Sequence, residues 1–166
     1  MPTGPAARTT DSVVHPLPPI LTPGPGALTV LIGFLPAWRA VPTGVGAGLQ
    51  AANQAATTAI KAAEATTAAA AGTPGAPAAY AAEQALKGSL LASMSAAITS
   101  AAAGADIHAC TTPLPVPPHG PGVVIDGSTT VMTTFLPQSR MGDTIIEAVG
   151  PPNKIVKGET TVIVGG

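Results

Sequence analysis

The sequence predicts a small, mainly β protein that is built from three repeated units and interrupted by an Ala-rich α-helical hairpin. Two observations lead to this fold class. The pattern Pro-x-x-Arg occurs three times, within flanks that carry short β-branched runs. Alanine is instead concentrated in a central stretch, where it fills 26 of the 62 positions from 44 to 105. Because alanine is the best helix former, this stretch is predicted to be helical and its flanks to be β.

The three copies of the pattern share their internal spacing. They are Pro5-Ala6-Ala7-Arg8, Pro36-Ala37-Trp38-Arg39 and Pro137-Gln138-Ser139-Arg140. In the second and third copies a glycine, Gly26 or Gly127, precedes the proline by ten residues. An aspartate follows the arginine by three residues in the first and third copies, at Asp11 and Asp143, and each lies fifteen residues before a glycine. This regularity indicates three copies of one structural unit.

Each unit is expected to contain a turn, an acidic residue, a loop, a turn glycine and a strand. The predicted strands cover residues 29–32, 129–132 and 160–164, with a further strand at 123–125. In the second unit the expected aspartate position holds Pro42, so we assign its role to Asp106, on the far side of the alanine-rich stretch. We expect the arginines to hydrogen-bond backbone carbonyls and the aspartates to cap the turns.

The alanine-rich stretch is predicted to form two helices, over about 44–71 and 78–104. The segment Gly72-Thr73-Pro74-Gly75-Ala76-Pro77 between them cannot continue a helix. The second helix carries apolar residues every fourth position, which would pack one of its sides. The predicted organisation is therefore a β part made of residues 1–43 and 106–166, and an inserted helical hairpin of residues 44–105.

Charge and cysteine content exclude some classes of protein. Seven basic against eight acidic residues give a net charge of -1, so no basic surface exists to hold a phosphate backbone, and we predict no nucleic-acid partner. A single cysteine cannot form an internal disulfide. The uncharged stretches of the central region are rich in Ala, Gly, Ser and Thr, which is too weakly apolar to predict a membrane span.

Histidine and cysteine together point to a metal site. The candidate ligands are His15, His108, Cys110 and His119, and a set of imidazoles with one thiolate favours Zn²⁺. His15 and Cys110 each follow the aspartate of their unit by four residues, so they fall at equivalent places. Glu147 occupies that place in the third unit. By themselves these residues also allow the alternative of solvated histidines with a buried free thiol.

Several of these segments resemble the PAAR-repeat family. The resemblance rests on Pro5 to Arg8 with Asp11, the strand Thr29-Val30-Leu31-Ile32-Gly33, Asp106 to Cys110, and Pro118-His119-Gly120. It covers everything outside the predicted hairpin, although two of the three Pro-x-x-Arg copies are degenerate. It implies a small three-repeat PAAR-like β-cone with zinc at its apex, and it matches His15, His108, Cys110 and His119 to the family's zinc ligands.

Proteins of this family are the tips of contractile injection systems, such as type VI secretion systems. The resemblance therefore implies a structural protein that caps and sharpens a trimeric β-helical spike, with one tip per trimer, for membrane puncture. Cargo attachment is a further role. It also implies assembly in the cytoplasm without a signal peptide, which agrees with the uncharged start of the chain, and delivery outside the cell with the machine.

Two other classes of function compete with that of a spike tip. A zinc hydrolase is disfavoured because Cys110 would fill the open ligand position, and Glu147 is the one candidate general acid or base, so we expect no enzyme activity. The second class is a partner-, chaperone- or membrane-binding adaptor that acts through the hairpin. The charged residues within the predicted helices favour a watery or protein-covered surface over a bilayer; they are Lys61, Glu64, Glu83 and Lys87.

Overall fold

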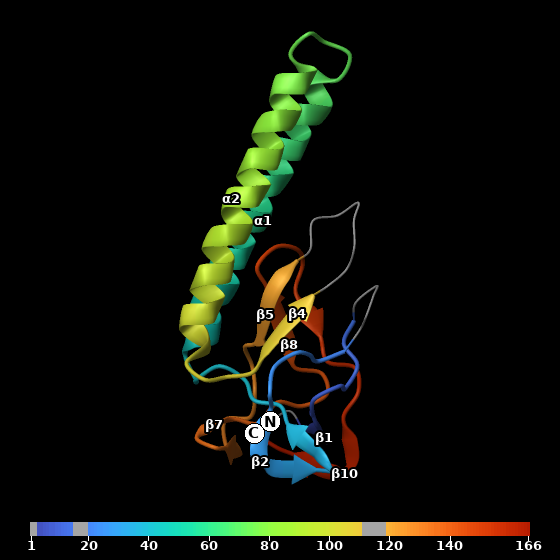
Figure 1. The fold of residues 1–166 in the computed structure, drawn as a ribbon, viewed down its shortest axis with the longest axis vertical. Coiled ribbons are helices and arrows are strands. Elements are labelled where there is room, and N and C mark those ends of the chain that lie inside the picture. Colours follow the sequence, from blue (N-terminus) through green and yellow to red (C-terminus); the bar gives the residue numbers. More distant parts are fainter. Residues whose placement is uncertain (1–2, 15–19, 111–118) are drawn as a thin grey trace.

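The computed structural model describes residues 3–14, 20–110 and 119–166 and shows a mixed α/β protein (Figure 1). About 35% of it is helix and 30% strand, so the expectation of a mainly β protein is wrong. The two helices have 26 and 27 residues, whereas no strand in the described ranges is longer than six. The elements are β1 (Gly4–Ala6), β2 (Ala27–Ile32), β3 (Leu35–Ala37), α1 (Val45–Ala70), α2 (Ala76–Ala102), β4 (Ile107–Cys110), β5 (Gly120–Val124), β6 (Met132–Thr133), β7 (Leu136–Pro137), β8 (Thr144–Glu147), β9 (Asn153–Lys154) and β10 (Glu159–Val164).

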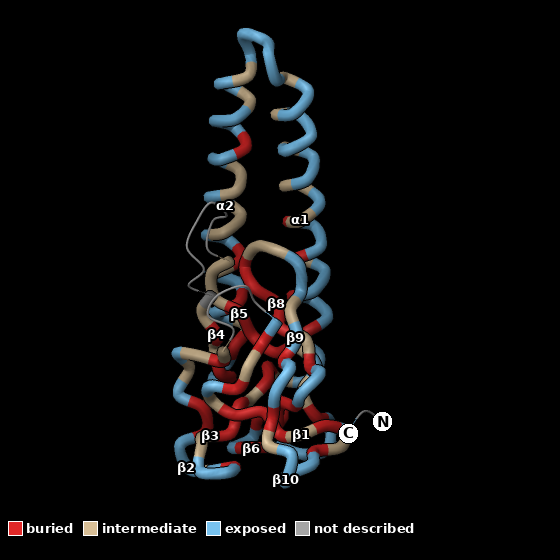
Figure 2. The backbone as a smooth tube through the Cα atoms, turned by 90° about the vertical axis from the view of Figure 1, so that its right-hand side faces the viewer, coloured by how far each residue is buried: buried red, intermediate tan, exposed pale blue. Residues whose placement is uncertain are grey.

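Three antiparallel strand pairs form one end of the molecule, which we call the base (Figures 1 and 2). They are β2 with β3, β6 with β7, and β10 with β1. The last pair joins the two ends of the chain, with Gly4 opposite Val164. The strands predicted at 29–32 and 160–164 are confirmed within β2 and β10.

The strand predicted at 129–132 is largely wrong, because β6 contains Met132–Thr133 alone. The cause is a local turn. The Ser128 hydroxyl oxygen accepts hydrogen bonds from the backbone N–H groups of Thr130 at 3.2 Å and Val131 at 2.9 Å, which competes with strand pairing. The strand predicted at 123–125 is confirmed in part, since β5 covers Gly120–Val124.

The three Pro-x-x-Arg copies meet in a closed ring of backbone hydrogen bonds. Ala7 N–H donates to the Ser139 carbonyl at 2.9 Å, Ser139 N–H to that of Trp38 at 3.0 Å, and Trp38 N–H to that of Ala7 at 2.9 Å. A second set of N–H to carbonyl hydrogen bonds runs around the ring in the opposite direction, from Thr9 to Pro36, from Ala40 to Pro137 and from Met141 to Pro5. Each copy therefore contacts the other two in the same way, and the three units are arranged with pseudo-threefold symmetry.

One side chain lies on the axis of this ring. The amide nitrogen of Gln138 is 3.1 Å from the Ala7 carbonyl, 3.2 Å from that of Trp38 and 3.0 Å from that of Ser139. The equivalent residues in the other copies are Ala6 and Ala37, both fully buried. Because three long side chains would overlap at one axis, a single glutamine with two alanines fills the space.

An arginine–aspartate pair closes the turn of each unit. The aspartate carboxylate accepts the backbone N–H of the arginine at 2.8 Å in all three, which confirms the predicted caps; the pairs are Arg8–Asp11, Arg39–Asp106 and Arg140–Asp143. The guanidinium groups bind the same carboxylates and also carbonyls, as in Arg39 to Gly26 at 3.3 Å. The prediction for Asp106 is confirmed, since it pairs with an arginine 67 positions earlier, across the helices.

The predicted helical hairpin is confirmed as α1 and α2. Helix α2 begins at Ala76 rather than 78, because Pro77 fits the first turn of a helix, where no N–H is required of it. Gly46, Leu49 and Ala56 of α1, with Met94 and Ile98 of α2, are buried, and all but Gly46 belong to one apolar cluster with Val123 and Ala148. The lower half of the hairpin is thereby attached to the four-stranded sheet β4–β5–β8–β9, which we call the apical sheet.

The hairpin rises beside the apical sheet, away from the base, and continues past it (Figures 1 and 2). Lys87 links its two helices, with its ammonium nitrogen 2.7 Å from Glu64 and 2.6 Å from Glu83, and these hydrogen bonds raise the pKa of Lys87. Within the described ranges, neither helix is apolar over a length that would cross a membrane.

Candidate functional site

Two of the four predicted metal ligands are placed by the apical sheet: His108 lies within it and His119 at its edge. His108 belongs to β4, and His119 directly precedes β5, its antiparallel neighbour. His108 is buried, and the His119 side chain retains 18% of its exposure. The two histidines are brought together by a third residue, Glu147 of β8.

Glu147 contacts both histidines from a fully buried position. Its carboxylate oxygen Oε2 is 2.8 Å from Nδ1 of His119, and Oε1 is 3.4 Å from Nε2 of His108. A carboxylate accepts hydrogen bonds, so the short contact assigns a proton to Nδ1 of His119. The remaining ring nitrogen, Nε2, is then the atom that has a lone pair for a metal ion.

The register of the apical sheet explains why these side chains meet. Gly122 of β5 lies opposite His108 on one side and opposite Glu147 on the other. Residues directly opposite in antiparallel strands point to the same face, so both side chains lean over position 122. A Cβ atom there would lie 2.8 Å from Cγ of Glu147, so glycine leaves the space in which the carboxylate reaches the histidines.

The other two predicted ligands are outside what the structure describes. His15 lies in the range 15–19, and the same applies to the side chain of Cys110, whose backbone ends β4. Across residues 3–14, 20–110 and 119–166, no group of three or more His, Cys, Asp or Glu side chains is arranged to hold a metal ion. Imidazole and carboxylate are nevertheless donor types that Zn²⁺ accepts, so the chemistry of the pair suits a zinc site completed by further ligands.

The repeat spacing indicated Glu147, four residues after Asp143, as a residue at a potential ligand position. It did not predict that Glu147 contacts the two histidines. The signal that was missed is Gly122, one of two glycines in β5. A glycine within a strand often marks a close approach by a neighbouring group, and here that group is the Glu147 side chain.

A second candidate site is the base, which carries exposed apolar side chains at equivalent positions of the repeats. Leu31, Met132 and Ile163 occupy one set of such positions and are between 54% and 62% exposed. Phe34 and Phe135 occupy another, at the turns of the β2–β3 and β6–β7 pairs, and are 94% and 97% exposed. Gly166 stands at the corresponding place of the third pair. The apolar pattern of the base therefore follows the pseudo-threefold symmetry.

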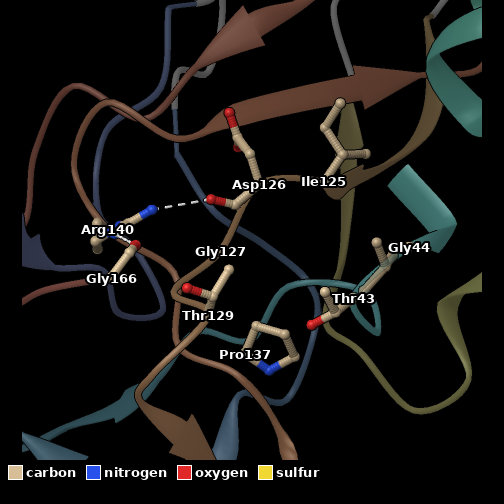
Figure 3. Close-up of a pocket in the computed structure, with 10 residues that line it drawn as sticks. Thr43, Gly44, Ile125, Asp126, Gly127, Thr129, Pro137, Arg140 and Gly166 are labelled. Atoms are coloured by element: carbon tan, nitrogen blue, oxygen red, sulfur yellow. Dashed lines mark hydrogen bonds between the residues drawn. The ribbon is translucent and has the colours of Figure 1, made fainter. Parts of the chain in front are cut away.

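A cavity of about 340 Å³ lies beside the ring. Among the residues that line it, Arg140 and Gly166 face Asp126 and Gly127 (Figure 3). Arg140 is already engaged there, because its guanidinium donates to the Asp126 carbonyl at 3.0 Å and to the Asp143 carboxylate at 3.1 Å. It also donates to the Gly166 carbonyl. We interpret this cavity as part of the scaffold.

Comparisons with protein-family models, with curated proteins and with solved structures found no match to this chain.

Proposed function

We propose that this protein is the tip of the central spike of a contractile injection system, of the PAAR-repeat type. The observation that carries the proposal is the base. It presents equivalent apolar residues around a pseudo-threefold axis, which is the arrangement that a single chain needs to sit on the end of a symmetric trimer. In this function the tip would cap and sharpen a trimeric β-helical spike and lead it through a membrane.

The exposure of the base supports a docking surface. Large apolar side chains that gather on one face of a protein mark sites of interaction with other proteins. Aromatic anchors such as Phe34 and Phe135 are typical of the residues that contribute most to binding energy. The hairpin and the apical sheet extend away from the base, so they leave it clear for a partner.

The proposal includes a structural zinc ion at the apex, held by His15, His108, Cys110 and His119. A metal ion there would join segments from different units and resist their separation under load. Glu147 would orient His119 through its Nδ1–H, as carboxylates commonly do for zinc-bound histidines.

The zinc site predicts a metal content of about one ion per chain, measured by elemental mass spectrometry on protein purified without an affinity tag. The ion should resist prolonged chelation, since a closed four-ligand site releases zinc slowly. Soluble, folded protein with less than about a tenth of an equivalent would remove the zinc site from the proposal.

Docking on a trimer is tested by native mass spectrometry and binding titration with the trimeric β-helical spike protein of the same injection system. We expect one tip per trimer. The double variant Phe34→Asn/Phe135→Asn should bind at least about 100-fold more weakly, because both aromatic anchors are lost. Its folding should not suffer, since both residues are exposed and have positive φ angles, 66° and 67°, which asparagine tolerates.

The control for this titration is Tyr80→Asn, which changes an exposed aromatic residue of the hairpin. It should leave binding to the spike unchanged. Equal affinity of the wild-type protein and the double phenylalanine variant, or a stoichiometry of three tips per trimer, would contradict docking through the base.

A further inference from the structure

Besides the apolar cluster, a buried polar side chain of the hairpin, Asn53 of α1, contacts the end of the apical sheet. It lies in the row Gly46, Leu49, Asn53 and Ala56, which faces the sheet, and is 1% exposed. Asparagine is unfavourable in the middle of a helix, and a buried amide lowers stability unless it is hydrogen-bonded. An apolar residue would suit this row equally well, so the amide calls for a specific explanation.

The hydrogen bonds of Asn53 supply that explanation. Its amide nitrogen donates to the backbone carbonyl of Glu147 at 3.0 Å and to that of Gly150 at 3.2 Å. One side chain of the hairpin thus holds both ends of the turn 147–150, directly after β8. Glu147 is the residue whose carboxylate contacts His108 and His119.

The turn held by Asn53 also forms the surface on which His119 packs. A Cβ atom at Gly150 would lie 3.3–3.4 Å from three atoms of the His119 ring, so the ring rests against this glycine. The N–H of Val149 donates to the His119 carbonyl at 3.0 Å. The backbone, the ring and the Nδ1 atom of His119 are therefore all contacted by residues 147–150.

The second helix of the hairpin contacts the other side of the same site. A Cβ atom at Gly120, next to His119, would lie 2.9 Å from Leu91 and 3.3 Å from Ser95 of α2. Helix α1 therefore holds the turn after Glu147, while α2 packs against the residue that follows His119. The two helices enclose the histidine site from one side.

We propose that the inserted hairpin positions the apical histidine site, and that Asn53 is the positioning residue through which it does so. The amide fixes the turn 147–150. That turn then fixes the His119 ring against Gly150 and its Nδ1 atom against the Glu147 carboxylate. The part of the test that measures zinc release rests on the proposed function, because it requires the zinc site. The parts that measure the His119 tautomer and the amide exchange of Val149 do not require zinc.

The test compares Asn53→Leu with Gln54→Leu, an equivalent change at the neighbouring, exposed position of the same helix. Leucine removes the amide but keeps the size of the side chain and favours the helix. In metal-free protein, above the pH at which histidines titrate, long-range ¹H–¹⁵N spectra report which ring nitrogen carries the proton. We expect His119 protonated on Nδ1 in wild type and Gln54→Leu, and a mixture of both tautomers in Asn53→Leu.

Two further measurements complete the test. Amide exchange of Val149 should be about 10- to 100-fold faster in Asn53→Leu, because the turn that holds it is no longer fixed. Zinc release to a chelator should be faster by a factor of about 10 to 100, as for other losses of groups that orient metal ligands. If Asn53→Leu does not fold, Asn53→Ala removes the same amide without added bulk.

The outcomes separate this inference from the proposed function. An unchanged tautomer and unchanged Val149 exchange in Asn53→Leu would overturn the positioning role, whatever the metal content. If wild type binds no zinc but both structural readouts change, the positioning role holds and the zinc site is withdrawn. If zinc release alone changes while the tautomer does not, Asn53 acts on the metal by another route, and the inference is wrong.

Discussion

Replacing Gln138 by leucine is expected to lower the free energy of unfolding by about 3–5 kcal/mol. The amide nitrogen of this fully buried residue lies within 3.2 Å of three carbonyl oxygens, one from each repeat. The side-chain carbonyl oxygen of Gln138 accepts a hydrogen bond from the Thr133 hydroxyl at 2.6 Å. Leucine has a similar size but bonds with none of these groups.

The loss would be large because all the affected groups are buried and interdependent. The three carbonyls keep their ring hydrogen bonds but lose a shared donor, and the Thr133 hydroxyl loses its acceptor. Each buried polar group left with too few partners costs about 1–3 kcal/mol, and a network of this kind is weakened as a whole. Chemical denaturation followed by circular dichroism measures the effect.

Gln138→Glu sharpens the test, since it replaces the amide NH₂ by an oxygen and alters little else. A carboxylate would face three carbonyl oxygens, so we expect this variant to be at least as destabilised as Gln138→Leu. Gln50→Leu, on the exposed side of α1, serves as the control and should change stability by no more than about 0.5 kcal/mol. A loss below about 1 kcal/mol in both Gln138 variants would show that the axial amide does not hold the ring.

The ring shows how far repeat spacing predicts a fold. The recurring Pro-x-x-Arg pattern and the equal spacing of its flanking glycines and aspartates were enough to predict three equivalent units. Asp106 was assigned to Arg39 because the expected aspartate position holds Pro42 and the second unit continues beyond the hairpin. The axial role of Gln138 was not predictable, since it depends on the third unit departing from the alanine of the other two.

The candidate site was predictable in its residue types but not in its contacts. The histidines were identified from the affinity of imidazole for metals, and two of them, His108 and His119, meet in the structure. The contact of both with Glu147 depends on strand register and on Gly122, which residue spacing along the chain does not reveal. Asn53 was missed for the same reason, because its partners lie 94 and 97 positions away.

The predicted fold class was wrong in the relative amounts of helix and strand, not in the kinds of element. The helices were placed almost correctly, at Val45–Ala70 and Ala76–Ala102, but at about 35% of the structure they outweigh the strands of the β part, at about 30%. Much of that part is held by turns, ring hydrogen bonds and arginine–aspartate pairs instead of long ladders. Sequence patterns of alternating residues do not report such contacts.

The arginine–aspartate pair that spans the hairpin yields the second prediction of large effect. Asp106→Ala is expected to lower the free energy of unfolding by about 3–5 kcal/mol, because it leaves the Arg39 guanidinium, itself 14% exposed, without its carboxylate. Asp106 is fully buried and accepts three hydrogen bonds from Arg39, at 2.8, 2.9 and 2.8 Å. Hydrogen bonding to this carboxylate raises the pKa of Arg39. The arginine keeps its charge when its partner is removed, because a guanidinium group is not deprotonated in proteins.

A double-mutant cycle separates the pair from the loss of a single charge. Arg39→Met with Asp106→Leu removes both charges, and we expect the double variant to be more stable than Asp106→Ala, since no buried charge is left uncompensated. Glu64→Ala, which breaks an ion pair with a half-exposed carboxylate on the hairpin, should cost no more than about 1 kcal/mol. If Asp106→Ala lowered the free energy of unfolding no more than Glu64→Ala does, the prediction would be wrong. The Arg39–Asp106 pair would then not be what holds the two ends of the hairpin together, and packing would hold them instead.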